Sequence, residues 1–212
     1  MQNTFEIIFS NSFYFLALIN PASKVFLLSS IQPPLTRQKL WSISMHASLT
    51  GLGILLILSA IGKFLFTVVF RVELYSIQIV GGIVLFTVGF QAIRKGVFFS
   101  RHLSGSDTDI SIVPLAAPLI AGPGTITAVL SFATHHGVWL TWLAITLAVA
   151  GNFGIMILSQ TISRFMDRYH AAGPLIRIAG LIVAAVAVQM FLTGLGQWFT
   201  TILDGYSLQI TK

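Results

Sequence analysis

The chain is divided into long apolar runs that few charged residues interrupt, and this pattern restricts its fold more than any motif does. Charged residues make up 8% of the 212 residues and hydrophobic residues 55%. A soluble domain carries about 25% charged residues, because it must present a wetted surface. The runs therefore predict an all-α integral membrane protein that is surrounded largely by lipid.

Six runs are long enough to span a bilayer, since a helix needs about 20 apolar residues to cross the hydrocarbon core. They cover residues 5–31, 40–62, 74–93, 112–134, 138–160 and 174–199. Lys and Arg are concentrated in the loops after the first, third and fifth runs. The positive-inside rule places these loops in the cytoplasm and both termini outside.

The two halves of the chain resemble each other. Residues 77–84 read IQIVGGIV and residues 176–183 read IRIAGLIV, so five of eight positions match, although chance matches are common in apolar sequence. Pro21 and Pro123 form a second pair at a similar offset. Three spans per half require the second copy to enter from the opposite side, as in the inverted repeats of secondary transporters. The predicted units are a three-helix repeat over 1–96, a cytoplasmic linker over 97–111, an inverted three-helix repeat over 112–199 and an outward-facing tail over 200–212.

Pro and Gly interrupt the first and fourth spans at matching places, Asn20-Pro21 and Gly122-Pro123-Gly124. Proline removes a backbone donor and frees carbonyls one turn upstream. Each break also starts a half-helix whose first N–H groups are unpaired and carry the positive end of the helix dipole. The alternative is a simple kink, because Pro and Gly are frequent in membrane helices.

Two such half-helix ends, meeting near the midplane, predict a site for a carboxylate. The freed carbonyls opposite predict a position for an ammonium group or a coupling cation. A small neutral amino acid or similar zwitterion offers both charges. The candidate substrate-binding residues are Asn20, Pro21, Ser23, Lys24, Gly122, Pro123, Gly124 and Thr125.

Ionisable residues inside a span are functional candidates, because burying a charge there is costly. Lys24 either faces the site or extends its amine to the cytoplasmic interface. His46 is either a proton-coupling group or a hydrogen-bonded structural residue. No Asp or Glu lies in the middle of a span, so coupling would use Na⁺, His46 or no ion. The neutral residues expected to bridge helices are Gln78, Gln91, Asn152 and Gln189.

Several function classes lack their characteristic residues. The chain has no His-Glu-x-x-His, Gly-x-Ser-x-Gly or Walker A sequence, so no enzyme and no ATP-driven pump is expected. Cysteine is absent, and His135-His136 lacks partners at ligand spacing, so neither a metal site nor a cofactor is expected. The net charge of +6 comes from short loops rather than a basic face, which argues against nucleic-acid binding.

Residues 113–126, VPLAAPLIAGPGTI, resemble the signature of the MarC-related proteins, also called the small neutral amino acid transporter (SnatA) family. Asn20-Pro21, residues 81–83, and residues 188–191 with Gly194 extend the resemblance over nearly the whole chain. It implies six spans in the bacterial inner membrane and, for some members, transport of glycine, alanine and similar amino acids.

The first span departs from the family pattern, which often reads Asn-Pro-x-Gly-Asn-x-Pro. Ser23 stands for the glycine, Lys24 for a polar neutral residue and Phe26 for the second proline. Lys24 would pair with a substrate carboxylate or act as an internal cation at the half-helix end. The family's substrate therefore need not apply to this chain.

The leading hypothesis is a secondary transporter of small neutral amino acids that works by alternating access, in a direction that the residues do not specify. The first alternative is a non-transporting membrane scaffold or partner subunit, in which the broken helices serve packing alone. The second is a channel or exporter of another small solute. The expected partners are the lipid bilayer and a small-molecule substrate.

Overall fold

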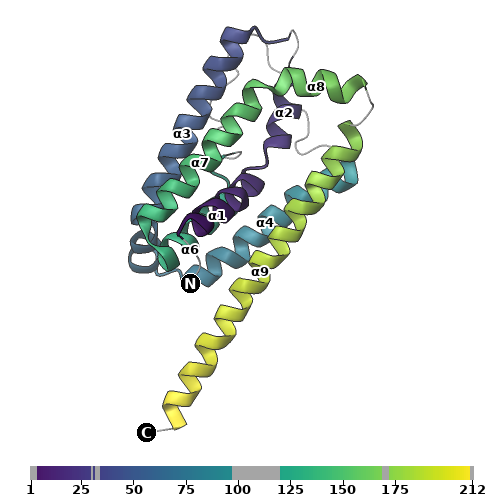
Figure 1. The fold of residues 1–212 in the computed structure, drawn as a ribbon. Helices are drawn as coiled ribbons and strands as arrows, with labels where there is room; N and C mark the ends of the chain where they lie inside the picture. Colours follow the sequence, from purple (N-terminus) through teal and green to yellow (C-terminus); the bar gives the residue numbers. More distant parts are fainter. Residues whose placement is uncertain (1–3, 30, 32–33, 97–119, 169–171, 211–212) are drawn as a thin grey trace.

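The computed structural model describes residues 4–29, 31, 34–96, 120–168 and 172–210, and every regular element in these ranges is helical (Figure 1). The first half contains α1 (Thr4–Ile19), α2 (Pro21–Ser29), α3 (Arg37–Phe64) with a π-helical turn (Leu65–Val69), and α4 (Leu74–Lys95). The second half contains α6 (Pro123–His136), α7 (Val138–Ile157), α8 (Ser159–Arg168) and α9 (Ala172–Ile210).

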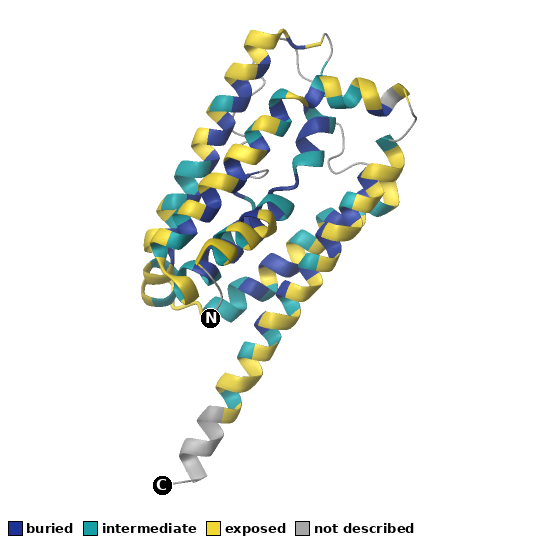
Figure 2. Ribbon diagram, viewed as in Figure 1, coloured by how far each residue is buried: buried dark blue, intermediate teal, exposed yellow. Residues whose placement is uncertain are grey.

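Within the described ranges, five helical segments are long and apolar enough to cross a membrane: Thr4–Ser29, Arg37–Val69, Leu74–Lys95, Val138–Ile157 and Ala172–Leu203. Large apolar side chains such as Ile57, Val80 and Leu181 are exposed on their outward faces (Figure 2). A continuous apolar exterior of this kind requires lipid around it.

The predicted linker 97–111 and the start of the fourth span, 112–119, lie outside the described residues. The second half of that span is α6. The six-span inverted repeat therefore stays a prediction. The start of α1 and the end of α9 both lie at the end of the bundle opposite α8 (Figure 1).

Helices α4 and α9 form a closely packed antiparallel pair. A Cβ on Gly89 would lie 2.7 Å from Ala184 N and 2.8 Å from Gly180 O, and one on Gly194 would lie 2.8 Å from Tyr75 O. Small residues let membrane helices approach in this way. In the predicted six-span repeat, α4 and α9 correspond to the third and sixth spans.

The helices α1, α3, α6 and α7 pack beside this pair (Figure 1). Trp142 Nε1 of α7 donates to Ser59 Oγ of α3 at 2.9 Å. The rings of Phe15 in α1 and Phe132 in α6 meet edge to face, with centroids 5.7 Å apart. These contacts fix α1 and α6 around the interior of the bundle.

Two boundaries differ from the prediction. The fifth span ends at Ile157 rather than residue 160, and the expected loop from residue 164 is instead part of α8, which lies across the end of the bundle (Figure 1). This helix buries Met166, and Gln160 Nε2 donates to Leu35 O at 2.7 Å. A short helix with one polar face suits the membrane interface. Because its hydropathy is low, a search for apolar spans does not detect it. The second difference is that α9 continues through the predicted tail to Ile210.

Candidate functional site

The first span breaks at Asn20, as predicted. Asn20 has φ 55°, a left-handed conformation that Asn tolerates better than most residues. Its N–H donates to the carbonyls of Leu16 at 3.0 Å and Ala17 at 3.1 Å, which ends α1. Pro21 then begins α2, so one span consists of two half-helices.

Ser23 closes the start of α2 onto the break. Its side chain is buried, and its hydroxyl donates to Asn20 O at 2.7 Å, while its N–H donates to the same oxygen at 3.2 Å. The hydroxyl proton is therefore used inside the break in this structure.

Lys24 points back towards the break instead of towards the C-terminal end of α2. Only 1% of the residue is exposed. Its Nζ donates to Ile19 O and, at 3.4 Å, to Asn20 O. Helical side chains lean towards the N-terminus of their helix, and this brings the amine to the C-terminal end of α1, where the helix dipole is negative.

The second predicted break falls at the start of α6, and this end of α6 is packed against α4. Gly122 is extended, with φ −77° and ψ 168°, and α6 begins at Pro123 with no side-chain cap. Thr125 is buried. A Cβ on Gly124 would lie 2.9 Å from Leu85 Cδ2, so Leu85 fills the space on that side of the first turn.

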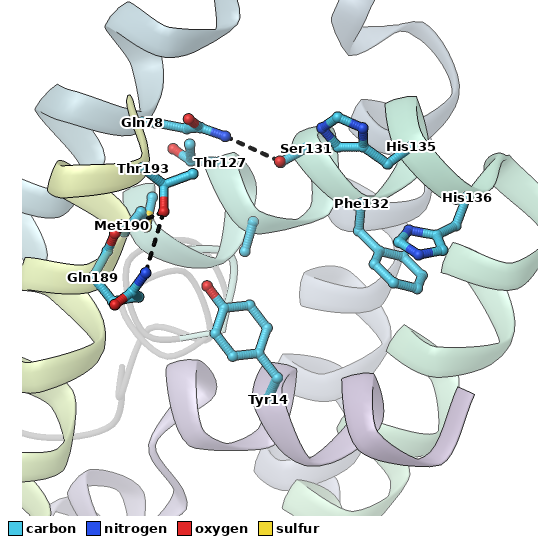
Figure 3. A pocket seen from close by; sticks show the side chains of 11 residues that line it. Tyr14, Gln78, Thr127, Ser131, Phe132, His135, His136, Gln189, Met190 and Thr193 are labelled. Atoms are coloured by element: carbon cyan, nitrogen blue, oxygen red, sulfur yellow. Dashed lines mark hydrogen bonds between the residues drawn. The ribbon is translucent and has the colours of Figure 1, made fainter. Parts of the chain in front are cut away.

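A cavity of about 190 Å³ lies next to this break, between α1, α4, α6 and α9 (Figure 3). None of the eight predicted substrate-binding residues lines it. Its polar side chains are those of Tyr14, Gln78, Thr127, Ser131, His135, His136, Gln189 and Thr193, and its apolar side chains are those of Ala128, Phe132 and Met190. The sequence signal that could have identified this cavity is the presence of two glutamines, Gln78 and Gln189, inside predicted spans.

Gln78 has one amide atom paired and the other unpaired. It is 4% exposed, and its Nε2 donates to Ser131 Oγ at 3.0 Å, which links α4 to α6 as expected (Figure 3). Its Oε1 is buried and has no hydrogen-bond partner in the part of the chain that the structure describes. A buried acceptor without a donor costs free energy, so this oxygen calls for a ligand or water.

Among the described residues that line the cavity, none is Asp, Glu, Lys or Arg. On one side, His136 stacks on Phe132 with ring centroids 4.3 Å apart. Tyr14 reaches in from α1, with its hydroxyl towards the gap between α6 and α9 (Figure 3). Neutral donors and acceptors beside aromatic surface suit a small solute without net charge.

Other predicted polar residues lie elsewhere. His46 is exposed, and its Nδ1 lies 2.8 Å from Ser42 O of its own helix, away from both breaks and the cavity. Gln189 Nε2 lies 3.5 Å from Thr193 Oγ1, and Asn152 Nδ2 lies 3.2 Å from Met156 Sδ. Each of these contacts lies within one helix. These side-chain contacts of Gln189 and Asn152 therefore do not bridge helices, contrary to the prediction.

Together, the apolar exterior and the broken first span define an integral membrane protein with several spanning helices. The family description "MarC family integral membrane protein" matches residues 5–199, and the chain belongs to the MarC family, which confirms the resemblance in the sequence.

Similar proteins carry the name UPF0056 membrane protein. One from Pyrococcus horikoshii is 29% identical, covering 93% of this chain and 98% of the relative. YvbG of Bacillus subtilis is 26% identical, covering 86% and 91%. One from Aquifex aeolicus is 29% identical, covering 90% and 94%. No solved structure matches the chain significantly.

Proposed function

We propose that this protein is a secondary transporter of small neutral amino acids or similar zwitterions, and that the cavity between α1, α4, α6 and α9 binds the solute. The observation that carries the proposal is the cavity itself: a polar lining inside a membrane protein, in which no described residue is Asp, Glu, Lys or Arg, close to the start of α6. Polar groups inside a membrane are costly and usually mark a solute pathway.

The lining offers a partner to each end of a zwitterion. Gln78 Oε1 is a buried acceptor with no hydrogen-bond partner among the described residues, and a rotation of the amide would turn it towards an ammonium group in the cavity. Ser131 Oγ already accepts from Gln78, so its proton is available to a carboxylate. Thr193 Oγ1 donates its proton to Gln189 O at 2.9 Å and therefore offers the solute an acceptor. A cationic solute would find no carboxylate among the described residues of the lining, and an unpaired charge is unfavourable in a low-dielectric site.

The position of the cavity fits access from outside. It extends along α6 from Thr127 to His136, which is the end of that helix that the distribution of Lys and Arg places outside. Its inner end lies one turn beyond Gly124, which Leu85 covers. Alternating access would require the two broken spans to rearrange, so that the inner end of the cavity opens. We place the protein in the bacterial inner membrane on the strength of the family resemblance.

Thermal unfolding of the detergent-purified protein with and without candidate solutes tests the proposal. A ligand that binds only the folded state raises its stability by mass action. We expect glycine, alanine or serine to raise the melting temperature in a saturable manner. Propionate and ethylamine, which each carry one charge of alanine without the other, should not.

Counterflow in proteoliposomes then separates transport from binding alone. Vesicles loaded with unlabelled alanine should accumulate labelled alanine transiently, and vesicles without the protein should not. If no neutral amino acid stabilises the protein or exchanges across the vesicle membrane, this proposal is wrong. The alternatives are then a non-transporting scaffold or a protein that carries another small solute.

A further inference from the structure

Lys24 occupies the position that the first break prepares for a cation. We propose that Lys24 is a tethered cation: its ammonium group fills a site of backbone carbonyls at the end of α1 that would otherwise take a monovalent metal ion. This inference rests on the proposed transport function. It adds that solute binding does not require Na⁺.

The carbonyls of this site come from the break itself. The last carbonyls of a helix have no donor four residues further on, and they carry the negative end of the dipole. Asn20 turns to a positive φ directly after α1, so Ile19 O and Asn20 O are both turned towards Lys24 Nζ. Unwound carbonyls and half-helix C-termini are the groups that hold Na⁺ in broken-helix transporters.

The burial of Lys24 supports a built interaction. Its residue is 1% exposed, and Val25 and Leu28 beside it are buried as well. A primary ammonium buried in this way is costly unless strong acceptors surround it. The carbonyls of Ile19 and Asn20 supply acceptors of this kind.

The lysine and a metal ion cannot use these carbonyls together. While Nζ donates to Ile19 O and Asn20 O, the position is filled, and stability should not depend on which monovalent cation is in the buffer. Lys24→Ala removes the ammonium and most of its stem, which leaves the two carbonyls facing the vacated space. Na⁺, or a free primary alkylammonium, could then refill it.

The test compares melting temperatures of the wild type, Lys24→Ala and Lys24→Arg in chloride salts of equal ionic strength. The salts are sodium, choline, propylammonium and tetramethylammonium chloride. Propylammonium restores the lost N–H donors, whereas tetramethylammonium has the same charge and no N–H. Lys24→Met, which removes the charge but keeps an apolar stem, replaces Lys24→Ala if that variant does not fold.

We expect the wild type and Lys24→Arg to melt at the same temperature in all four salts. The variant without the cation should melt several degrees lower in choline, and Na⁺ and propylammonium should each restore the loss with saturation. Saturable stabilisation of the wild type by Na⁺ over choline would overturn the proposal. The proposal would also be overturned if propylammonium stabilises the variant that lacks Lys24 while Na⁺ does not. The same holds if no salt changes the melting temperature of that variant.

Alanine in the same series keeps the two proposals apart. A Lys24→Ala protein that responds to Na⁺ while the wild type ignores alanine would support the tethered cation and contradict the transport proposal. A wild type that binds alanine only in Na⁺ would support transport and overturn the tethered cation.

Discussion

Leu85 of α4 lies against Gly124 in the first turn of α6, and a Cβ on Gly124 would be 2.9 Å from Leu85 Cδ2. Thr127, which lines the polar cavity, is on the same helix one turn further on. The contact therefore lies between the second break and the cavity. It explains why the residues of that break are packed in this structure, while those one turn away line an open space.

Gly124→Val should destabilise the protein by about 1–3 kcal/mol, because a larger side chain must displace Leu85 from a packed position. Replacing Leu85 with Ala in the same protein should recover part of the loss, and a double-mutant cycle of unfolding free energies measures this coupling. Gly53→Val is the matched control, since nothing lies within 4 Å of a Cβ there. Additive losses at Leu85 and Gly124 would contradict the contact.

Gly89→Ala should separate α4 from α9. The new Cβ would lie 2.7 Å from Ala184 N and 2.8 Å from Gly180 O, and backbone atoms cannot move away as a flexible side chain can. We expect a loss of about 1–3 kcal/mol in detergent, as for other overpacked sites. Gly154→Ala on α7, where a Cβ meets nothing within 4 Å, should leave the melting temperature nearly unchanged. Equal stability of the two variants would show that the helices are not in such close contact.

His46→Leu should change neither alanine affinity nor its dependence on pH. His46 is exposed, and its Nδ1 faces Ser42 O of the same helix, so its protonation should not reach the cavity. Alanine titrations of the wild type and the variant across pH 6–8, the range in which histidine titrates, check this. A pH dependence that disappears with His46 would reinstate it as a coupling group.

The parts of the fold that depend on local chemistry could be predicted from the sequence. A run of apolar residues identifies a span, and Asn20-Pro21 identifies a break, because Pro lacks an N–H and Asn accepts a left-handed backbone. Residues 77–84 and 176–183, which match each other in sequence, lie on α4 and α9, and the structure packs these two helices together. By contrast, α8 is too short and too polar to register as a span.

The candidate site could be predicted only in part, because it depends on contacts between distant segments. Gln78 and Ser131 are 53 residues apart and meet only when α4 packs on α6. Each residue alone resembles an ordinary polar residue of a membrane helix. The sequence allowed two positions for the Lys24 amine, at the break or at the cytoplasmic interface. Only the direction of the side chain in the structure distinguishes them.

The most direct test of the central claim is alanine binding by Gln78→Leu, measured as the saturable rise in melting temperature. Gln91→Leu serves as the control, because it makes the same change about 20 Å further along α4 at 1.5 Å per residue and does not line the cavity. We expect Gln78→Leu to fold, since it removes the unpaired Oε1 together with a hydrogen bond worth about 1 kcal/mol, and to lose the response to alanine, while Gln91→Leu keeps it. An unchanged alanine response in folded Gln78→Leu would contradict the assignment of this cavity as the solute site.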